Sequence, residues 1–372
     1  MQTRHYLDWN ATTPVLPSVV AAMQAALADG WGNPSSVHAE GRAARLRVEQ
    51  GRAALARLGG VDVRDVILTS GGTEANNIAL RSAFHTVTTA PPRLVLSALE
   101  HPSVTRVAEA LSAEGRAELR WIRVNGDGMA ELDDLALAFR EGPVKLVALQ
   151  SVNHETGMIQ PVVEAAKLAV DHGALLHVDM VQAWGKVPVA PDVGDTRSFA
   201  AHKIRGPKGI GALLGRERVR ILPVLRGGAQ ERGLRPGTVD PIACAGLAEA
   251  TRHAISGAER YRQVAHLRDD LEARLVAMGG IVNGGAARAP HVANLSWLGR
   301  DGAELVAALD LEGLAVSSGS ACSAGTSEVS PVIRAMAGEA RARGAVRFSL
   351  GETSSVDDVL FADAATRRVL AR

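Results

Sequence analysis

The chain has 372 residues, of which 47% are hydrophobic and 22% charged, a composition typical of a globular protein with two or three domains. Its 41 basic and 40 acidic residues leave a formal net charge of +1, which argues against a nucleic-acid-binding protein. Two cysteines, Cys244 and Cys322, are too few for a disulfide framework or a C-x-x-C metal site, so we expect no metal centre and a reducing, cytoplasmic setting.

The N-terminal segment lacks the apolar core of a secretory signal. Residues 1–13 carry Arg4, His5 and Asp8, and no window of about 18 uncharged apolar residues occurs in the sequence. The sequence therefore predicts a protein that is neither exported nor inserted in a membrane.

Amphipathic stretches alternate with short β-branched runs through the first half of the chain. Helices are predicted over 40–58, from Thr73, from near Pro102 and over 162–171, and strands over 66–69, 93–97, 144–149 and 174–179. Further along, a glycine-rich turn at 206–211 separates two apolar segments, and a helical pattern over 251–278 ends at Gly279. This order predicts an α/β protein with a mostly parallel sheet between helices.

Reactive and polar residues follow several of the predicted strands, where ligands gather in α/β sheets. The 70–77 segment begins a helix with small residues and Thr73, a pattern that fits a phosphate site but also an ordinary capped turn. His101 and His154 follow the next strands, although a single histidine there is more often structural. Asp179 ends an apolar strand, and its burial requires a cation opposite it.

Lys203 follows an apolar stretch just before the glycine-rich turn. A desolvated lysine loses proton affinity and becomes a nucleophilic amine, whereas the alternative is an ordinary surface lysine. An anion site, a buried carboxylate, a histidine and an amine together are what pyridoxal 5'-phosphate requires. The amine forms the Schiff base, the carboxylate keeps the ring nitrogen protonated, and the helix start holds the phosphate.

These residues lie in segments that resemble the cysteine desulfurases of the class V aminotransferase group over nearly the whole chain. The matching segments are 6–8, 11–14, 32–38, 72–77, 100–101, 153–157, 177–182, 202–209, 227–238, 317–322 and 347–351. The resemblance implies the fold of pyridoxal-phosphate-dependent transferases. A large domain, 14–250, would hold a mixed, mostly parallel sheet, and 1–13 with 251–372 would form a smaller α+β domain carrying the nucleophile loop.

The resemblance also implies roles in binding the cofactor. Lys203 would carry it covalently, Asp179 would pair with the ring nitrogen, Gln182 would bond the phenolic oxygen, and His101 would stack on the ring and move protons. The phosphate would be held by Gly72, Thr73, His202 and, from a neighbouring subunit, Thr238.

The substrate and the nucleophile follow from the same resemblance. Asn153, which would also contact the cofactor, and Arg347 would bind the carboxylate of L-cysteine. Cys322 would be the nucleophile, and it lies in the small, polar 317–327 segment, which is typical of a mobile loop. Cys244 lies in an apolar helical run and is interpreted as an inert core residue.

The chain departs from the family pattern at several positions. Ala200 and Ala201 stand where Ser and Gly are common before the His-Lys pair, Pro236 replaces a usual Ser, and His154 replaces a frequent Asn. Because the Ser would bond the phosphate, Ala200 predicts weaker retention of the cofactor.

The expected function is therefore that of a homodimeric cysteine desulfurase. It would convert L-cysteine to L-alanine and leave a persulfide on Cys322 for a sulfur-acceptor protein, such as an iron–sulfur scaffold. A selenocysteine lyase or a class V aminotransferase is an alternative, although an aminotransferase would not need Cys322. A non-catalytic partner protein on the same fold is the alternative of another class, and Ala200 and Ala201 are its only support.

Overall fold

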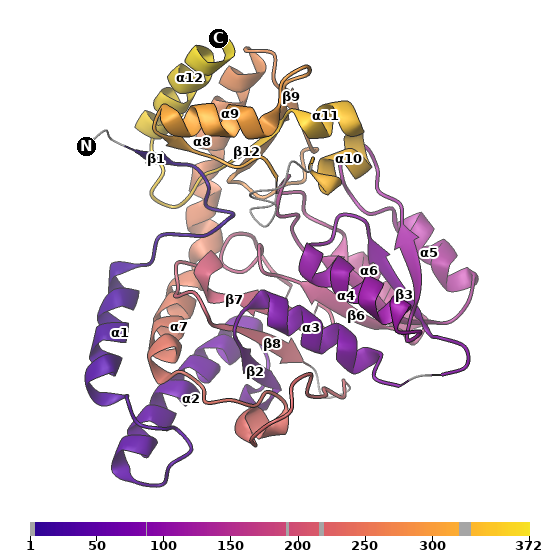
Figure 1. Ribbon diagram of the computed structural model, residues 1–372, viewed down its shortest axis with the longest axis vertical. Helices are drawn as coiled ribbons and strands as arrows, with labels where there is room; N and C mark the ends of the chain where they lie inside the picture. The colour runs from indigo at the N-terminus through magenta and orange to yellow at the C-terminus, as the bar shows by residue number, and fades with distance from the viewer. Residues whose placement is uncertain (1–3, 87, 191–192, 216–218, 320–328) are drawn as a thin grey trace.

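The computed structural model describes residues 4–86, 88–190, 193–215, 219–319 and 329–372. A seven-stranded sheet forms the centre of the larger part of the chain (Figure 1). Its strands lie in the order β2 (Val66–Thr69), β8 (Gly211–Gly215), β7 (Thr196–Ala200), β6 (Leu175–Asp179), β5 (Val144–Gln150), β3 (Arg93–Ser97) and β4 (Glu118–Ile122). Strand β8 is antiparallel to both of its neighbours, and the other pairs are parallel. The predicted mixed, mostly parallel sheet is confirmed.

Helices cover both faces of this sheet because its strands are apolar on both sides. On β3, Leu94 and Leu96 pack in one buried cluster with α3 (Gly72–Ala83) and α4 (Pro102–Ala113). Val95 points to the opposite face, into the cluster that includes residues of α2 (Ala39–Gly59), α5 (Leu132–Arg140), α6 (Val162–Asp171) and α7 (Pro241–Ala254). Helix α1 (Pro17–Asp29) packs on α7. Each face therefore has its own core.

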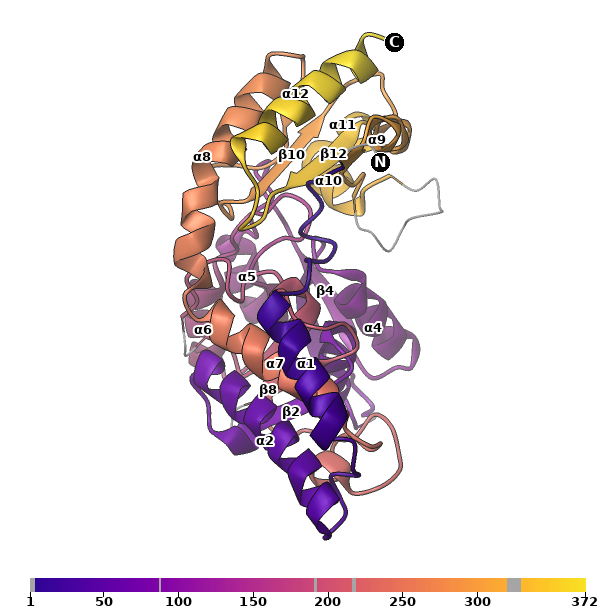
Figure 2. The same cartoon turned by 90° about the vertical axis from the view of Figure 1, so that its left-hand side faces the viewer.

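The C-terminal part has a separate, antiparallel sheet. Its strands lie in the order β12 (Ala345–Ser349), β10 (Val292–Ser296) and β9 (Ile281–Val282), and its apolar cluster includes residues of α8 (Gly257–Val276), α9 (Gly302–Leu311) and α12 (Val356–Leu370). Helices α8 and α12 contact one another and lie at the opposite end of the molecule from α1 and α2 (Figure 2). Helices α10 (Pro331–Ala337) and α11 (Glu339–Arg343) follow the 317–327 segment in the sequence.

The N-terminus returns to this C-terminal part. Strand β1 (His5–Tyr6) pairs in parallel with β11 (Leu314–Ala315), and Leu7 is buried in the same apolar cluster as α8 and α12. The pairing is compatible with a small domain of 1–13 and 251–372, but that division, like the 14–250 boundary, stays a prediction.

The sequence prediction left out several elements, α1 and α5 among them, and two of the differences have a clear physical cause. Strand β4 had no expected counterpart, because an edge strand with half-exposed, partly charged residues lacks an apolar run. The helical pattern over 251–278 is interrupted, with α7 ending at Ala254 and α8 beginning at Gly257. At this break a Cβ atom on Gly257 would lie 2.1 Å from the carbonyl oxygen of Gly185, so tertiary contact sets the boundary.

Within the described residues, no helix is both long enough and apolar enough to cross a membrane.

Candidate active site

A cavity of about 210 Å³ opens at the edge of the large sheet where the parallel strands end. Because β2, β3, β5, β6 and β7 all run toward this edge, the segments that follow them meet there. The cavity brings together most of the predicted site residues: Gly72, Thr73, His101, Asp179, Gln182, His202, Lys203 and Arg347. His154 and Ala200, two of the departures from the family pattern, also line it.

Asp179 lies at the end of β6 and is held by neutral hydrogen-bond donors. Its Oδ1 accepts from the Val181 amide at 3.0 Å and from the Ser198 hydroxyl at 3.0 Å, and its Oδ2 accepts from the Asn76 amide at 2.8 Å. A carboxylate has about four acceptor sites, so these bonds leave capacity for one more donor on the cavity side. The protonated ring nitrogen of pyridoxal 5'-phosphate would supply the cation that the sequence analysis predicts opposite Asp179.

Asn76, on α3, connects this carboxylate to His101. Its Nδ2 donates to the Ser103 hydroxyl at 2.8 Å as well as to Asp179, and its Oδ1 lies 2.9 Å from Nε2 of His177. The Ser103 backbone amide donates to Nδ1 of His101 at 3.1 Å, so the proton of a neutral His101 lies on Nε2. Burial lowers the pKa of His101 below its usual value, which favours this neutral form.

Lys203 is presented at the cavity by a single turn, Ala201–Lys203, that follows β7. Its amine donates to the backbone carbonyls of Asn10 and Ala11, the latter at 2.9 Å. The neighbouring His202 places Nδ1 at 3.1 Å from the Thr12 hydroxyl, and burial lowers its pKa to about 4. The N-terminal segment therefore forms one wall of the site.

Gln182 is fixed by a buried lysine that the sequence did not single out. Lys186 is 1% exposed and donates to Oε1 of Gln182 at 2.8 Å, so Nε2 of Gln182 must face the other way and donates to the Asn10 carbonyl at 2.9 Å. Burial lowers the pKa of Lys186 well below its usual value. The Gln182 amide and the Lys203 amine thus share the Asn10 carbonyl.

Helix α3 begins at the cavity with the turn predicted to hold a phosphate. Gly72 approaches the Asp179 region so closely that a Cβ atom there would lie 2.6 Å from Cγ2 of Val181. Glu74, in the first turn, accepts from the Ser70 backbone amide at 2.6 Å and so fixes the turn from its outer side. Gly72 and Thr73 remain on the cavity side, where a helix N-terminus favours an anion.

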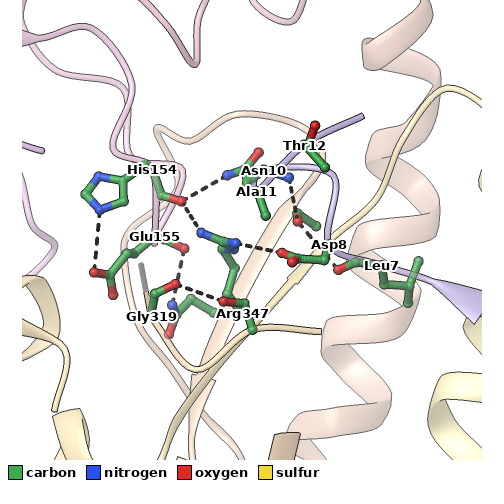
Figure 3. A network of polar contacts seen from close by, with 12 residues as sticks. Leu7, Asp8, Asn10, Ala11, Thr12, His154, Glu155, Gly319 and Arg347 are labelled. Atoms are coloured by element: carbon green, nitrogen blue, oxygen red, sulfur yellow. Dashed lines mark hydrogen bonds and ion pairs between the residues drawn. The ribbon is translucent and has the colours of Figure 1, made fainter. Parts of the chain in front are cut away.

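Arg347, on β12, lines the cavity from the C-terminal part of the chain. Figure 3 shows its contacts with Asp8 and His154. It is 2% exposed, and it donates through Nη1 to the His154 carbonyl at 2.8 Å and through Nη2 to Asp8 at 2.7 Å. Its buried Nε has no hydrogen-bond partner among the described residues. The guanidinium is therefore held in place by Asp8 and His154 while it keeps a donor for an anionic group.

Three predicted residues are not found in the cavity lining. Asn153 is fully buried, and its Oδ1 accepts from the backbone amides of Glu155 and Thr156, so its role in binding the carboxylate and the cofactor stays a prediction. Thr238 is exposed and does not line the cavity, so its role toward a neighbouring subunit stays a prediction. Cys322 lies outside the described residues.

Sequence reasoning missed the residues that hold the predicted ones in place. Asn76 and Asp8 lie inside the matching segments, yet an amide on a helix or a carboxylate near the N-terminus carries no chemical signal of its own. Lys186 lies four residues after Gln182, a spacing that places two side chains on neighbouring positions of a helical turn. That spacing is the one signal that could have found it.

Comparison with known proteins gives a consistent result. The family model described as "Aminotransferase class-V" matches residues 5–360. A cysteine desulfurase of Frankia sp. (strain EuIK1) is 38% identical, and the match covers 98% of this chain and 91% of that protein. A solved NifS-like protein has a TM-score of 0.91 and 30% identity over 99% of this chain and all of that one. A structure titled "SspA in complex with cysteine" has a TM-score of 0.81 and 27% identity, and covers 94% of this chain and all of that one.

The fold and the cavity are those of a pyridoxal-phosphate-dependent enzyme of the class V aminotransferase group. Within that group, the chain belongs to the cysteine desulfurase family.

The cavity fits the cofactor of this family. Asp179 keeps one acceptor site toward the cavity, the amine of Lys203 lies at its wall, and the N-terminus of α3 provides the anion site. The cavity therefore holds residues for an aldehyde, a protonated ring nitrogen and a phosphate. Ala200 replaces the Ser that would bond the phosphate, and Thr238 would come from a neighbouring subunit.

Proposed function

We propose that this protein is a cysteine desulfurase that converts L-cysteine to L-alanine and leaves the sulfur on Cys322 as a persulfide. The observation that carries the proposal is the convergence of Lys203, Asp179 and Arg347 on one cavity, from the turn after β7, from β6 and from β12. When bound to Lys203, pyridoxal phosphate supplies an electron sink that weakens bonds at the α and β carbons of an amino acid.

Arg347 orients the substrate. Its guanidinium is fixed by Asp8 and by the His154 carbonyl, and its buried Nε adds a donor for the substrate carboxylate. A lysine in this position would lack the planar fork that engages a carboxylate through two bonds. Arg347 therefore determines which end of L-cysteine lies next to Lys203.

His101 is the residue suited to move a proton within the cavity. Its Nδ1 is occupied by the Ser103 amide, so in the neutral ring Nε2 carries the exchangeable proton. Because burial lowers the pKa of His101, the ring stays neutral and presents this Nε2 proton to the cavity. Lys203 would serve as a second base at the same wall.

Cys322 is the sulfur acceptor in this proposal. Its thiolate attacks the sulfur of L-cysteine, a sulfur–sulfur bond forms as the carbon–sulfur bond breaks, and a proton completes the methyl group of L-alanine. The sum is L-cysteine plus a thiol giving L-alanine plus a persulfide, which is balanced without an external oxidant. Cys244 cannot substitute, because it is fully buried in α7 and burial raises its pKa to about 12.

The protein is further proposed to act as a cytoplasmic homodimer that passes sulfur to an acceptor protein such as an iron–sulfur scaffold. A dimer would give Thr238, which is exposed and does not line the cavity of its own chain, a phosphate to bind in the neighbouring subunit. Exposed apolar side chains around α1 and α2, Leu27, Trp31, Val37 and Leu46, provide surface for a subunit contact.

A turnover assay with a matched pair of variants tests the proposal. With L-cysteine and a reductant that releases persulfide sulfur, the wild type should form L-alanine and sulfide in equal amounts. Cys322→Ala should form neither, and Cys244→Ala should keep both activities. Alanine production that survives Cys322→Ala would favour the lyase alternative, and loss of the amino group from L-cysteine without alanine or sulfide would favour the aminotransferase alternative.

A further inference from the structure

The 230–238 segment, which ends at Thr238, is fixed to the strand and turn that precede the phosphate site of the same chain. Glu231 accepts two bonds from Arg52, at 2.6 and 2.7 Å, and one from the backbone amide of Leu68 on β2 at 2.8 Å. Arg232 donates to the carbonyl of Val66 on the same strand at 3.2 Å. The segment is therefore attached directly to the strand that leads into the phosphate turn.

The backbone of this segment indicates that the attachment is strong. Glu231 and Arg232 have φ values of 47° and 58°, a left-handed conformation that is uncommon for residues with a Cβ atom. Such residues persist where the surroundings fix them. Here the two-bond contact of Glu231 with the buried Arg52 provides that constraint.

A second contact reaches the phosphate turn itself. Arg235 donates to Oε1 of Glu74 at 3.0 Å, and the same carboxylate accepts from the Ser70 amide through Oε2 at 2.6 Å. The side chains of Arg235 and Glu74 are 22% and 16% exposed, so water screens the pair only in part. One carboxylate thus touches both the turn that would hold the phosphate and the segment that carries Thr238.

We propose that Glu74 and Arg235 are positioning residues that couple the two cofactor sites of the dimer. Glu74 fixes the phosphate turn of its own subunit, and Arg235 fixes the segment that delivers Thr238 to the phosphate of the neighbouring subunit. Binding of the cofactor in one site restrains its turn further, and through this ion pair it also restrains the Thr238 segment that serves the other site. The inference rests on the proposed function, since it requires the cofactor and the dimer.

Positive cooperativity in cofactor binding is the consequence. A phosphate bound in the first site favours the restrained turn of that subunit, and through the ion pair it favours the restrained Thr238 segment of the same subunit. Because that segment serves the other site, the second cofactor binds more tightly than the first. Without the ion pair, each site should bind independently and more weakly, because Thr238 and the turn are then ordered separately.

Titration of the cofactor-free dimer with pyridoxal 5'-phosphate, followed by visible absorption, tests the coupling. We expect a Hill coefficient above 1 for the wild type and for Arg235→Lys, which keeps the charge. Arg235→Gln and Glu74→Gln should each bind about tenfold more weakly, with a Hill coefficient near 1. Should either variant fail to fold, the other still decides the question.

The control is Arg81→Gln. Arg81 lies on the same helix and pairs with Glu114 at 3.2 Å, and this pair is more exposed than that of Arg235 and Glu74. The Arg81→Gln variant should therefore bind pyridoxal 5'-phosphate with the affinity and the Hill coefficient of the wild type. Independent sites in a dimeric wild type, or unchanged cooperativity in Arg235→Gln, would overturn the coupling alone. A wild type that binds no cofactor, or that is monomeric by light scattering, would overturn the proposed function as well.

Discussion

Replacing Asn76 by alanine should lower the free energy of unfolding far more than a typical asparagine-to-alanine change on the surface of a helix. Asn76 is 1% exposed, donates to Asp179 and Ser103, and accepts from His177. Losing a hydrogen bond to a carboxylate costs about 1.5–3 kcal/mol, and leaving the His177 ring nitrogen without its acceptor costs about 1–3 kcal/mol more. Allowing for relaxation, we expect the free energy of unfolding to fall by about 3–5 kcal/mol.

Urea denaturation of the cofactor-free protein measures this change, and Asn77→Ala provides the matched control. The Asn77 amide donates to the Thr73 carbonyl within the same helix, at an exposed position, so this variant should stay within about 0.5 kcal/mol of the wild type. Asn76→Asp adds a second test, because it places a carboxylate where the donor to Asp179 was and should weaken cofactor binding by like-charge repulsion. A loss below about 1 kcal/mol in Asn76→Ala would refute the role given to this amide.

Three further predictions concern the cofactor and pH. Ala200→Ser should restore a phosphate bond and tighten cofactor binding at least about tenfold in a spectroscopic titration, and equal affinities would show that no such bond forms. Burial lowers the pKa of His177 and His202 to about 4 in the folded protein, whereas a histidine in the unfolded chain has a pKa of about 6.5. Below pH 6.5 the unfolded chain therefore binds more protons than the folded protein. Stability should therefore be full above pH 6.5 and fall toward pH 4, less steeply in His177→Asn; an unchanged slope in that variant would contradict the reasoning. Because burial also lowers the pKa of Lys186, the wild type should gain stability relative to Lys186→Met between about pH 7 and 10, and a constant difference would contradict it.

Asp179 and Lys203 could be predicted from the sequence because a charged residue is unusual next to an apolar strand. Asp179 ends an apolar strand, and Lys203 follows one, so both stand out from the pattern of apolar residues around them. The parallel order of the strands then places them at one edge, and the structure confirms that they line one cavity.

The supporting residues could not be predicted in the same way. The donors that satisfy Asp179 come from three separate segments, and Arg347 takes Asp8 from the opposite end of the chain as its partner. Such contacts depend on how helices and strands pack in three dimensions, and the local pattern of apolar and polar residues does not determine that packing. Asn153 illustrates the limit, because its amide is used to shape the 153–156 turn and its side chain is absent from the cavity lining.

The most direct measurement is the mass of the peptide that contains Cys322 after the holoenzyme is incubated with L-cysteine and no reductant. The account predicts one added sulfur atom on Cys322, none on Cys244, and one L-alanine for each sulfur gained. L-alanine formed while Cys322 stays unmodified, or sulfur found on Cys244 instead, would contradict it.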